Sequence, residues 1–150
     1  MSLTTDINEQ IKTAMKAGDK IRLETLRSIR AGILDFEKSG IDREMTDDDA
    51  FTIINSAAKK RKDAIEQFDA AGRTEAADKE RQELAIIMEF LPAQMSEQEV
   101  HSAVAAIIEQ LGASQPSDFG KVMGVAVKQL KGKTDGSLIQ TITKKLLSGT

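Results

Sequence analysis

Two glycine- and lysine-containing stretches in the C-terminal third carry the clearest chemical signal of this chain. They are GKVMG, residues 120–124, and GKTDG, residues 132–136. Glycine weakens a helix by about 1 kcal/mol relative to alanine, so two glycines four residues apart in a helical pattern need a reason. Glycine exposes backbone to close approach, and a neighbouring lysine supplies positive charge. Both properties suit a phosphate backbone.

The periodicity of residues 119–130 places these groups on one side of a predicted helix. At about 100° per residue, Lys121, Gly124, Lys128 and Lys131 fall together, with Gly120 at the edge. The opposite side carries the apolar residues Phe119, Val122, Met123, Ala126 and Leu130. Two interpretations remain open. The exposed backbone can admit an anion, or it can admit another helix or a bend in the first turn.

The second stretch has a similar ambiguity. Gly132 suits the end of this helix and Asp135 suits the N-cap of the next, which explains most of GKTDG without a ligand. Gly136, however, would leave open N–H groups beside Lys133. A helix N-terminus binds anions, although an Asp135 cap would oppose one.

Positive charge concentrates around these stretches in a chain whose net charge is -3. Residues 1–92 hold 15 Lys and Arg against 19 Asp and Glu, whereas residues 93–150 hold 6 against 5. From residue 120 onward Asp135 is the one acidic residue. The lysines of this segment are Lys121, Lys128, Lys131, Lys133, Lys144 and Lys145. The sequence therefore predicts a basic surface for anionic partners.

A second basic patch is predicted around KKRK, residues 59–62. Arg61 falls within the apolar stripe of its helix, without an acidic neighbour one turn away. Glu80 lies on the apolar side of the following helix, so an Arg61–Glu80 ion pair is favoured over a recognition arginine. Arg30 is another candidate for this cluster.

Catalytic chemistry has little support in the sequence. The chain has no cysteine, and His101 is its single histidine, so thiolate, metal and triad sites lack ligands. Asp47, Asp48 and Asp49 fit the first turn of a helix, which favours negative charge. No phosphate-binding loop or dinucleotide fingerprint occurs. We predict no catalytic residue, no cofactor and no metal.

Composition also limits the RNA-binding modes and the cellular compartment that we expect for this protein. Aromatic residues make up 3% of the chain, without Trp or Tyr, which disfavours RNA binding by base stacking. Neither an apolar run of about 18 residues nor a secretory leader is evident, so we expect no membrane association. The sequence predicts the cytoplasm.

Helical periodicity and capping signals predict an all-α chain in two parts. Glycine and proline punctuate seven expected helices, which run from Asp6 to Gly18, Asp19 to Gly40, Thr46 to Gly72, Thr74 to Pro92, Ser96 to Gly112, Pro116 to Gly132, and onward from Asp135. Pro92 marks the clearest boundary. We expect an N-terminal helical bundle over residues 1–92 and a small helical domain over residues 93–150.

Three segments together resemble a known family. KKRKDAIEQFDAAGRTEAADKERQELAIIMEFLP, SDFGKVMG and GKTDG resemble the bacterial YqeY-like proteins in order and spacing, over nearly the whole chain. The C-terminal part resembles the GatB/YqeY tail domain shared with the B subunit of the glutamine-dependent amidotransferase that corrects misacylated Glu-tRNA(Gln) or Asp-tRNA(Asn). In that enzyme the tail domain helps to bind tRNA.

The resemblance implies an N-terminal bundle, a helical tail domain and a set of matched positions. The tail motif matches Gly120, Lys121, Val122, Met123 and Gly124, and the turn motif matches Gly132, Lys133, Asp135 and Gly136. The basic patch and AGR turn of the N-terminal part match Lys60, Arg61, Gly72 and Arg73. The resemblance brings no active site, because the B subunit performs its chemistry in a separate domain.

These observations predict a protein that binds tRNA, or acts with aminoacyl-tRNA-processing proteins, through Gly120, Lys121, Gly124, Lys128, Lys131, Lys133, Gly136 and Lys144. Lys60, Arg61 and Arg73 form the expected second patch. Two alternatives remain. The Gly120/Gly124 notch can dock a helix of a partner protein, or the chain can be a non-catalytic component of an amidotransferase. A carbon–nitrogen ligase activity would rest on the resemblance alone.

Overall fold

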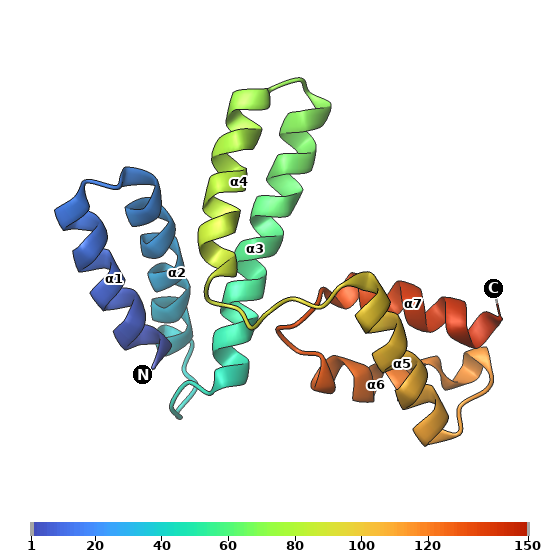
Figure 1. The fold of residues 1–150 in the computed structure, drawn as a ribbon. Helices are drawn as coiled ribbons and strands as arrows, with labels where there is room; N and C mark the ends of the chain where they lie inside the picture. Colours follow the sequence, from blue (N-terminus) through green and yellow to red (C-terminus); the bar gives the residue numbers. More distant parts are fainter. Residues whose placement is uncertain (1, 150) are drawn as a thin grey trace. The chain divides into compact units, whose positions relative to one another are not determined.

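The computed structural model describes residues 2–149 and confirms the all-α prediction. These residues form seven α-helices, one 3-10 helix and no strand (Figure 1). The elements are α1 (Leu3–Ala17), α2 (Lys20–Lys38), α3 (Asp47–Ala70), α4 (Thr74–Met88), α5 (Glu97–Leu111), η1 (Pro116–Asp118), α6 (Phe119–Gln129) and α7 (Gly136–Ser148).

Three predicted helix boundaries were wrong. Helix α1 begins at Leu3 rather than at Asp6, because the Ser2 hydroxyl accepts a hydrogen bond from the Thr5 N–H and caps it. Pro116 starts the short helix η1, and α6 begins three residues later at Phe119. Helix α4 ends at Met88, with Glu89 as its C-cap, rather than continuing through Leu91 to Pro92.

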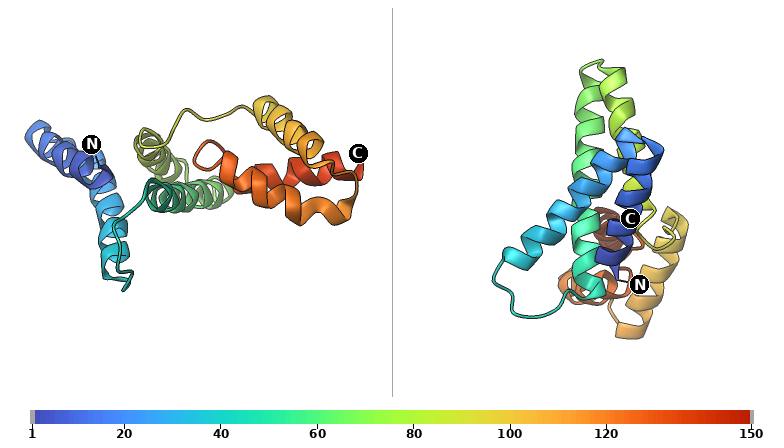
Figure 2. Two further views of the ribbon diagram at one scale, coloured as in Figure 1. Left: turned by 90° about the horizontal axis from the view of Figure 1, so that it is seen from below. Right: turned by 90° about the vertical axis from the view of Figure 1, so that its left-hand side faces the viewer.

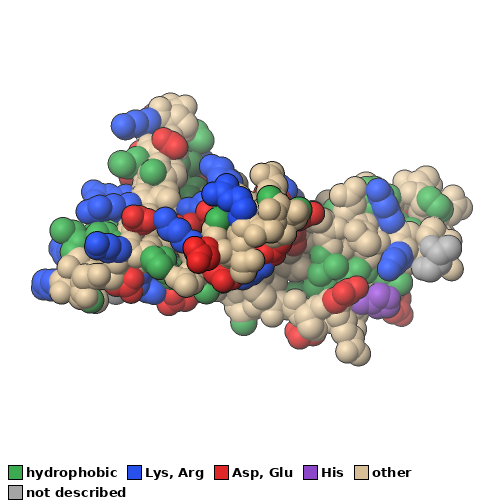
Figure 3. Space-filling view, turned by 90° about the horizontal axis from the view of Figure 1, so that it is seen from above, with side chains coloured by type: hydrophobic (Ala, Val, Ile, Leu, Met, Phe, Trp, Pro, Cys, Tyr) green, Lys and Arg blue, Asp and Glu red, His purple; other side chains and the backbone are tan. Residues whose placement is uncertain are grey.

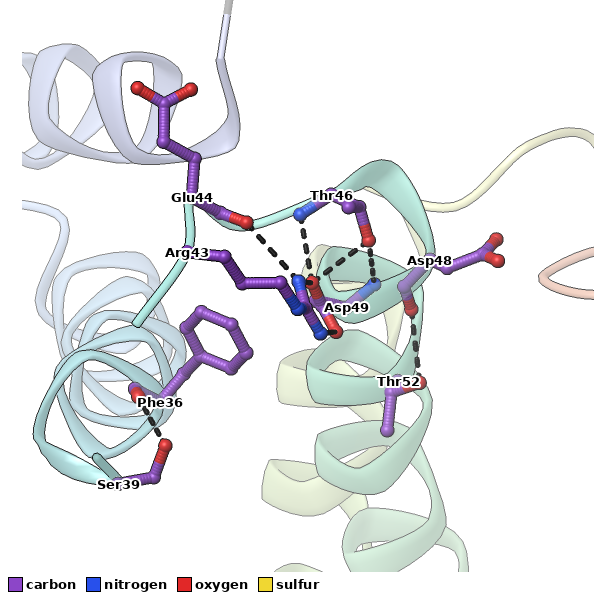
Figure 4. Close-up of polar contacts among 8 residues, drawn as sticks. All are labelled: Phe36, Ser39, Arg43, Glu44, Thr46, Asp48, Asp49 and Thr52. Carbon is purple, nitrogen blue, oxygen red and sulfur yellow. Dashed lines mark hydrogen bonds and ion pairs between the residues drawn. The ribbon is translucent and has the colours of Figure 1, made fainter. Parts of the chain in front are cut away.

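The connection between α2 and α3 is held by a capping box and one arginine (Figure 4). The Thr46 hydroxyl accepts from the Asp49 N–H at 3.2 Å, and the Asp49 carboxylate accepts from the Thr46 N–H at 2.8 Å. Arg43 donates to both Asp49 oxygens, at 2.5 and 3.1 Å. These hydrogen bonds lower the pKa of Asp49 far below its usual range, the largest effect coming from Arg43.

The chain divides into two compact units, residues 1–91 and residues 92–150, whereas the sequence predicted a division after Pro92. In the first unit, α1 and α2 form one antiparallel hairpin and α3 and α4 a second. Two further views show α3 and α4 side by side (Figure 2). The buried core of this unit comprises Ile7, Ile11, Ala14, Leu26, Ile29, Ile33, Ile54, Ala58 and Ile87.

The second unit packs α5, α6 and α7 around a core of its own. Its buried residues recur at helical spacing on the three helices, which is why each helix presents one apolar face inward. They are Val100, Val104, Ile107, Val122, Ala126, Leu130, Ile139, Ile142 and Leu147. This arrangement fixes the outward face of α6, where the glycines and lysines lie.

Candidate nucleic-acid interface

The two glycines of GKVMG lie on the solvent side of α6, and no described residue of the C-terminal unit covers them. A Cβ atom added at Gly120 or Gly124 would meet no neighbouring atom within 4 Å. Both residues have ordinary helical conformations, so backbone strain does not require glycine at either position. Packing within the described part of the C-terminal unit therefore does not explain them, and no other helix of that unit fills the notch.

Lysines flank these glycines on the same exposed surface. Lys121 and Lys128 are exposed on α6, while Val122 and Ala126 on its other side are fully buried. We call Gly120, Lys121, Gly124 and Lys128 the glycine–lysine face. Its four members belong to one rigid helix, so their spacing is fixed by the fold.

The remaining predicted lysines surround this face less closely. Lys131 is half-buried in the turn after α6, and Lys133 is exposed in the same turn. Lys144 is exposed on α7, where its ammonium group lies 5.7 Å from the centre of the Phe119 ring at the start of α6. The fold thus brings Lys144 to the same end of α6 as Gly120.

The turn that contains GKTDG is organised by backbone contacts. Gly132 is buried with a φ of +78°, a left-handed conformation that favours glycine. The Gln94 side chain donates to the Gly132 carbonyl at 2.8 Å, and the Met95 N–H donates to the Lys133 carbonyl at 2.9 Å. A structural role thus accounts for Gly132.

The start of α7 already has an acidic cap. The Asp135 carboxylate accepts from the Ser137 N–H at 3.1 Å, as the sequence predicted for a cap at this position. Its negative charge opposes an anion beside the exposed Gly136. Within the predicted set, Gly136 is therefore the residue whose surroundings suit phosphate least.

One carboxylate moderates the positive charge of the glycine–lysine face. Asp118 accepts hydrogen bonds from the N–H groups of Ser114 and Gln115, at 3.0 and 3.2 Å. These two bonds, followed by the charge of Lys121, lower the pKa of Asp118. Asp118 is consequently ionised at neutral pH, and its negative charge lies near Lys121.

Arg61 of the second predicted patch is turned inward. Its Nε atom lies 2.9 Å from the Glu83 carboxylate and 3.4 Å from that of Glu80, and one terminal nitrogen donates to the Ser28 hydroxyl at 3.3 Å. The predicted partner Glu80 is present, and the sequence interpretation missed Glu83. The signal existed, because Glu83 follows Glu80 by three residues on the same helical face. Arg30, the other suggested member, is exposed.

The structure does not gather the second patch into one surface. Lys60 is exposed, but its neighbour Arg61 is held by carboxylates. Arg73 lies beyond the end of α3, whose last residue is roughly 14 Å along the axis from Arg61. Its guanidinium stacks on the Phe68 ring at 5.1 Å. On the face of the molecule drawn in Figure 3, Lys and Arg side chains are interspersed with Asp and Glu side chains.

The described residues provide neither a metal site nor a membrane-spanning helix. Residues 2–149 contain no group of three or more His, Asp or Glu side chains placed to share a metal ion. His101 is exposed on α5. None of the helices over this range has both the length and the apolar character needed to span a membrane.

Known proteins resemble this chain over most of its length. A family model described as Yqey-like protein matches residues 4–147. "Altered inheritance of mitochondria protein 41, mitochondrial" from Pyrenophora tritici-repentis is 28% identical over 144 residues, covering 93% of this chain and 76% of the relative. The protein of the same name from Kluyveromyces lactis is 28% identical, covering 86% and 67%.

A third relative with this name, from Lachancea thermotolerans, is 32% identical and covers 75% of this chain and 61% of its own length. These relatives are fungal, so the bacterial source expected from the resemblance gains no support from them. Their names mention mitochondria and neither tRNA nor an amidotransferase. The family match covers far more than half of the chain, and this protein therefore belongs to the YqeY-like family.

Proposed function

We propose that this protein binds tRNA through the glycine–lysine face of α6. The observation that carries the proposal is the bare backbone at Gly120 and Gly124, which no described residue of the C-terminal unit covers. Exposed Lys121 and Lys128 stand beside it on the same helix. A phosphate group can approach such backbone closely while ammonium groups neutralise its charge.

Neighbouring residues extend the proposed interface. Lys144 adds a charge near the start of α6, and Lys133 adds one in the turn after it. Lys131 and Gly136 complete the set that the sequence predicted. The interface acts by binding, and specificity for one tRNA would come from the shape of the nucleic acid, because the proposed lysine contacts go to phosphates, which carry no sequence information.

Fluorescence anisotropy with labelled bulk tRNA tests this proposal. Binding to the wild-type protein should weaken strongly between about 50 and 200 mM salt, because phosphate contacts release counterions. The double variant Lys121→Glu/Lys128→Glu should lose binding. Lys16→Glu/Lys20→Glu makes the same charge change at exposed lysines of the first unit and should retain it. Equal losses of tRNA binding in the two variants would show that only the net charge of the protein matters, and would overturn the proposed site.

A second candidate function, docking of a partner helix, is favoured by one apolar residue on the same face. The Val127 side chain, one turn after Gly124, is 42% exposed and lies beside the notch. A small-residue notch next to an apolar side chain allows a partner helix to approach closely. Such binding should tolerate salt, whereas tRNA binding should not.

A role as a non-catalytic amidotransferase component is the third candidate, supported by the family resemblance of the C-terminal unit. It predicts that this chain raises the activity of a catalytic amidotransferase partner in the presence of glutamine, ATP and misacylated tRNA.

The cellular compartment of the protein also belongs to the proposal. The sequence predicts the cytoplasm, whereas the fungal relatives carry a mitochondrial name. Subcellular fractionation in the source organism decides between the two.

A further inference from the structure

A hollow of about 420 Å³ opens on the C-terminal unit between η1 and the last turns of α7. It is distinct from the Gly120/Gly124 notch, although Lys144 borders it. The residues that line it are Pro116, Phe119, Lys144, Lys145, Leu147 and Ser148. Three of them are apolar, two are cationic and none is acidic. The hollow thus combines an apolar floor with a positive rim.

The rim is preorganised by the fold. Lys144 and Lys145 are both exposed on the last two turns of α7, and Leu147 anchors this end of the helix in the core. The Lys144 ammonium group lies 5.7 Å from the centre of the Phe119 ring, a cation–π contact that holds it beside the hollow. Lys144 therefore lies over the Phe119 ring, and Pro116 and Leu147 form the rest of the apolar floor.

We propose that this hollow docks a protein segment in which an apolar side chain is flanked by carboxylates. The apolar side chain would pack against Pro116 and Leu147, beside the Phe119 ring over which Lys144 lies. The carboxylates would pair with Lys144 and Lys145. Charge complementarity supports an acidic occupant, because the charged residues of the lining, Lys144 and Lys145, are both cationic.

A nucleobase fits the same hollow less well. The Lys144 ammonium group lies over the Phe119 ring, where a base would have to stack. Phe119 is also the one aromatic residue of the lining, so a base has no other ring on which to stack. An aliphatic side chain needs no ring to stack on and can pack against Pro116 and Leu147, so an acidic peptide with one apolar side chain is the occupant we propose.

The inference goes beyond tRNA binding by α6 and can hold or fail without it. A direct test titrates the full-length ¹⁵N-labelled protein with a synthetic ten-residue peptide that has a central Leu-Phe pair between aspartates. Amide shifts should concentrate at Pro116-adjacent residues, Phe119 and Leu147. A matched peptide with Ser-Ser at the centre should bind at least about tenfold more weakly, because the apolar contact is lost.

Charge reversal at Lys144 and Lys145 provides a second test of this proposal. Lys144→Glu/Lys145→Glu should weaken the acidic peptide by about tenfold or more and should gain affinity for a peptide whose aspartates are replaced by lysines. The control Lys16→Glu/Lys20→Glu has the same net charge and should bind like wild type. Circular dichroism checks that each variant is folded.

Three results would overturn the proposal. The first is shifts spread along α6 or absent from the hollow, and the second is equal affinity for the Leu-Phe and Ser-Ser peptides. The third is binding of a cytidine-cytidine-adenosine trinucleotide at these residues in preference to the peptide, which would assign the hollow to RNA. Loss of tRNA binding in the α6 variant leaves this test unaffected, so the two proposals can be judged separately.

Discussion

The Arg61 guanidinium of α3 lies 2.9 Å from the Glu83 carboxylate of α4, and both side chains are largely withdrawn from water. Glu80 adds a second carboxylate at 3.4 Å, and Ser28 links the cluster to α2. One arginine therefore joins three helices of the first unit. The cluster is structural, and it removes Arg61 from the set of residues available to bind nucleic acid.

Arg61→Ala should destabilise the protein by about 3 kcal/mol, because it leaves two carboxylates without their partner in a largely buried place. Urea denaturation followed by circular dichroism measures this loss. The neighbouring exposed residue provides the control, and Lys60→Ala should change the free energy of unfolding by less than about 0.5 kcal/mol. A similar small effect for both substitutions would contradict a structural role for Arg61.

The pKa of Glu83 gives this cluster a pH dependence. Burial, followed by the charge of Glu80, raises the pKa of Glu83 above its ordinary value of 4.5, although Arg61 and Lys79 act in the opposite direction. The folded protein then holds the Glu83 proton more tightly than the unfolded chain does. Stability from this source is complete below the ordinary value and is lost as pH rises through the raised pKa.

Glu83→Gln should remove the part of the pH dependence of the free energy of unfolding that comes from this carboxylate. Urea denaturation of the wild type and the variant at a series of pH values from 4 to about 7 provides the comparison. The free energy of unfolding of the wild type should fall relative to that of Glu83→Gln as pH rises. A difference that stays constant or grows with pH would show that the ion pair with Arg61 outweighs burial.

The Thr46–Asp49 capping box should show the opposite pH dependence. Hydrogen bonds from Arg43 and Thr46 depress the pKa of Asp49 below its ordinary value of 3.8. The stability it contributes is present above that value and is lost as pH falls through the depressed pKa. In thermal melts at decreasing pH, the wild type should lose its advantage over Asp49→Asn.

The contribution of the Thr46 hydroxyl to the stability of the same capping box can be measured at neutral pH. Thr46→Ala should cost about 1 kcal/mol, because the Asp49 N–H loses its acceptor at the start of α3. Thr46→Ser retains the acceptor and should stay close to wild type. If serine and alanine were equally destabilising, the capping hydrogen bond would not be the source of the loss.

Two glycines with opposite surroundings test the proposed interface. Gly124→Ala should stabilise the protein by about 0.5–1 kcal/mol, because α6 is helical there and the added methyl group meets nothing. The same methyl group would keep a phosphate backbone away, so tRNA affinity should fall. A substitution that raises stability while lowering affinity separates binding from folding.

Gly32 is the matched control for that substitution. A Cβ atom at Gly32 would lie 2.8 Å from the Ile53 Cγ2 atom, on a stiff β-branched side chain of α3. Gly32→Ala should therefore destabilise the protein by about 1–3 kcal/mol and leave tRNA affinity unchanged once the protein is folded. Unchanged tRNA affinity in Gly124→Ala would remove the close-approach argument for α6.

The sequence alone was sufficient for the helical class, most helix ends and the face of α6 that carries the lysines. These features are local. Apolar spacing decides which side of a helix is buried, and capping residues such as Thr46 and Asp135 act on backbone groups within three positions. The sequence also predicted that Arg61 needs an acidic partner, since a charge within an apolar stripe cannot remain unpaired.

Only the tertiary structure decided which residues from different helices meet. It placed Glu83 closer to Arg61 than Glu80, left Gly120 and Gly124 uncovered, and separated Arg73 from Lys60. It also joined η1 to the end of α7 around a lysine-rimmed hollow that no single helix contains. Such contacts depend on how helices cross and where each one stops, which periodicity along one helix does not specify.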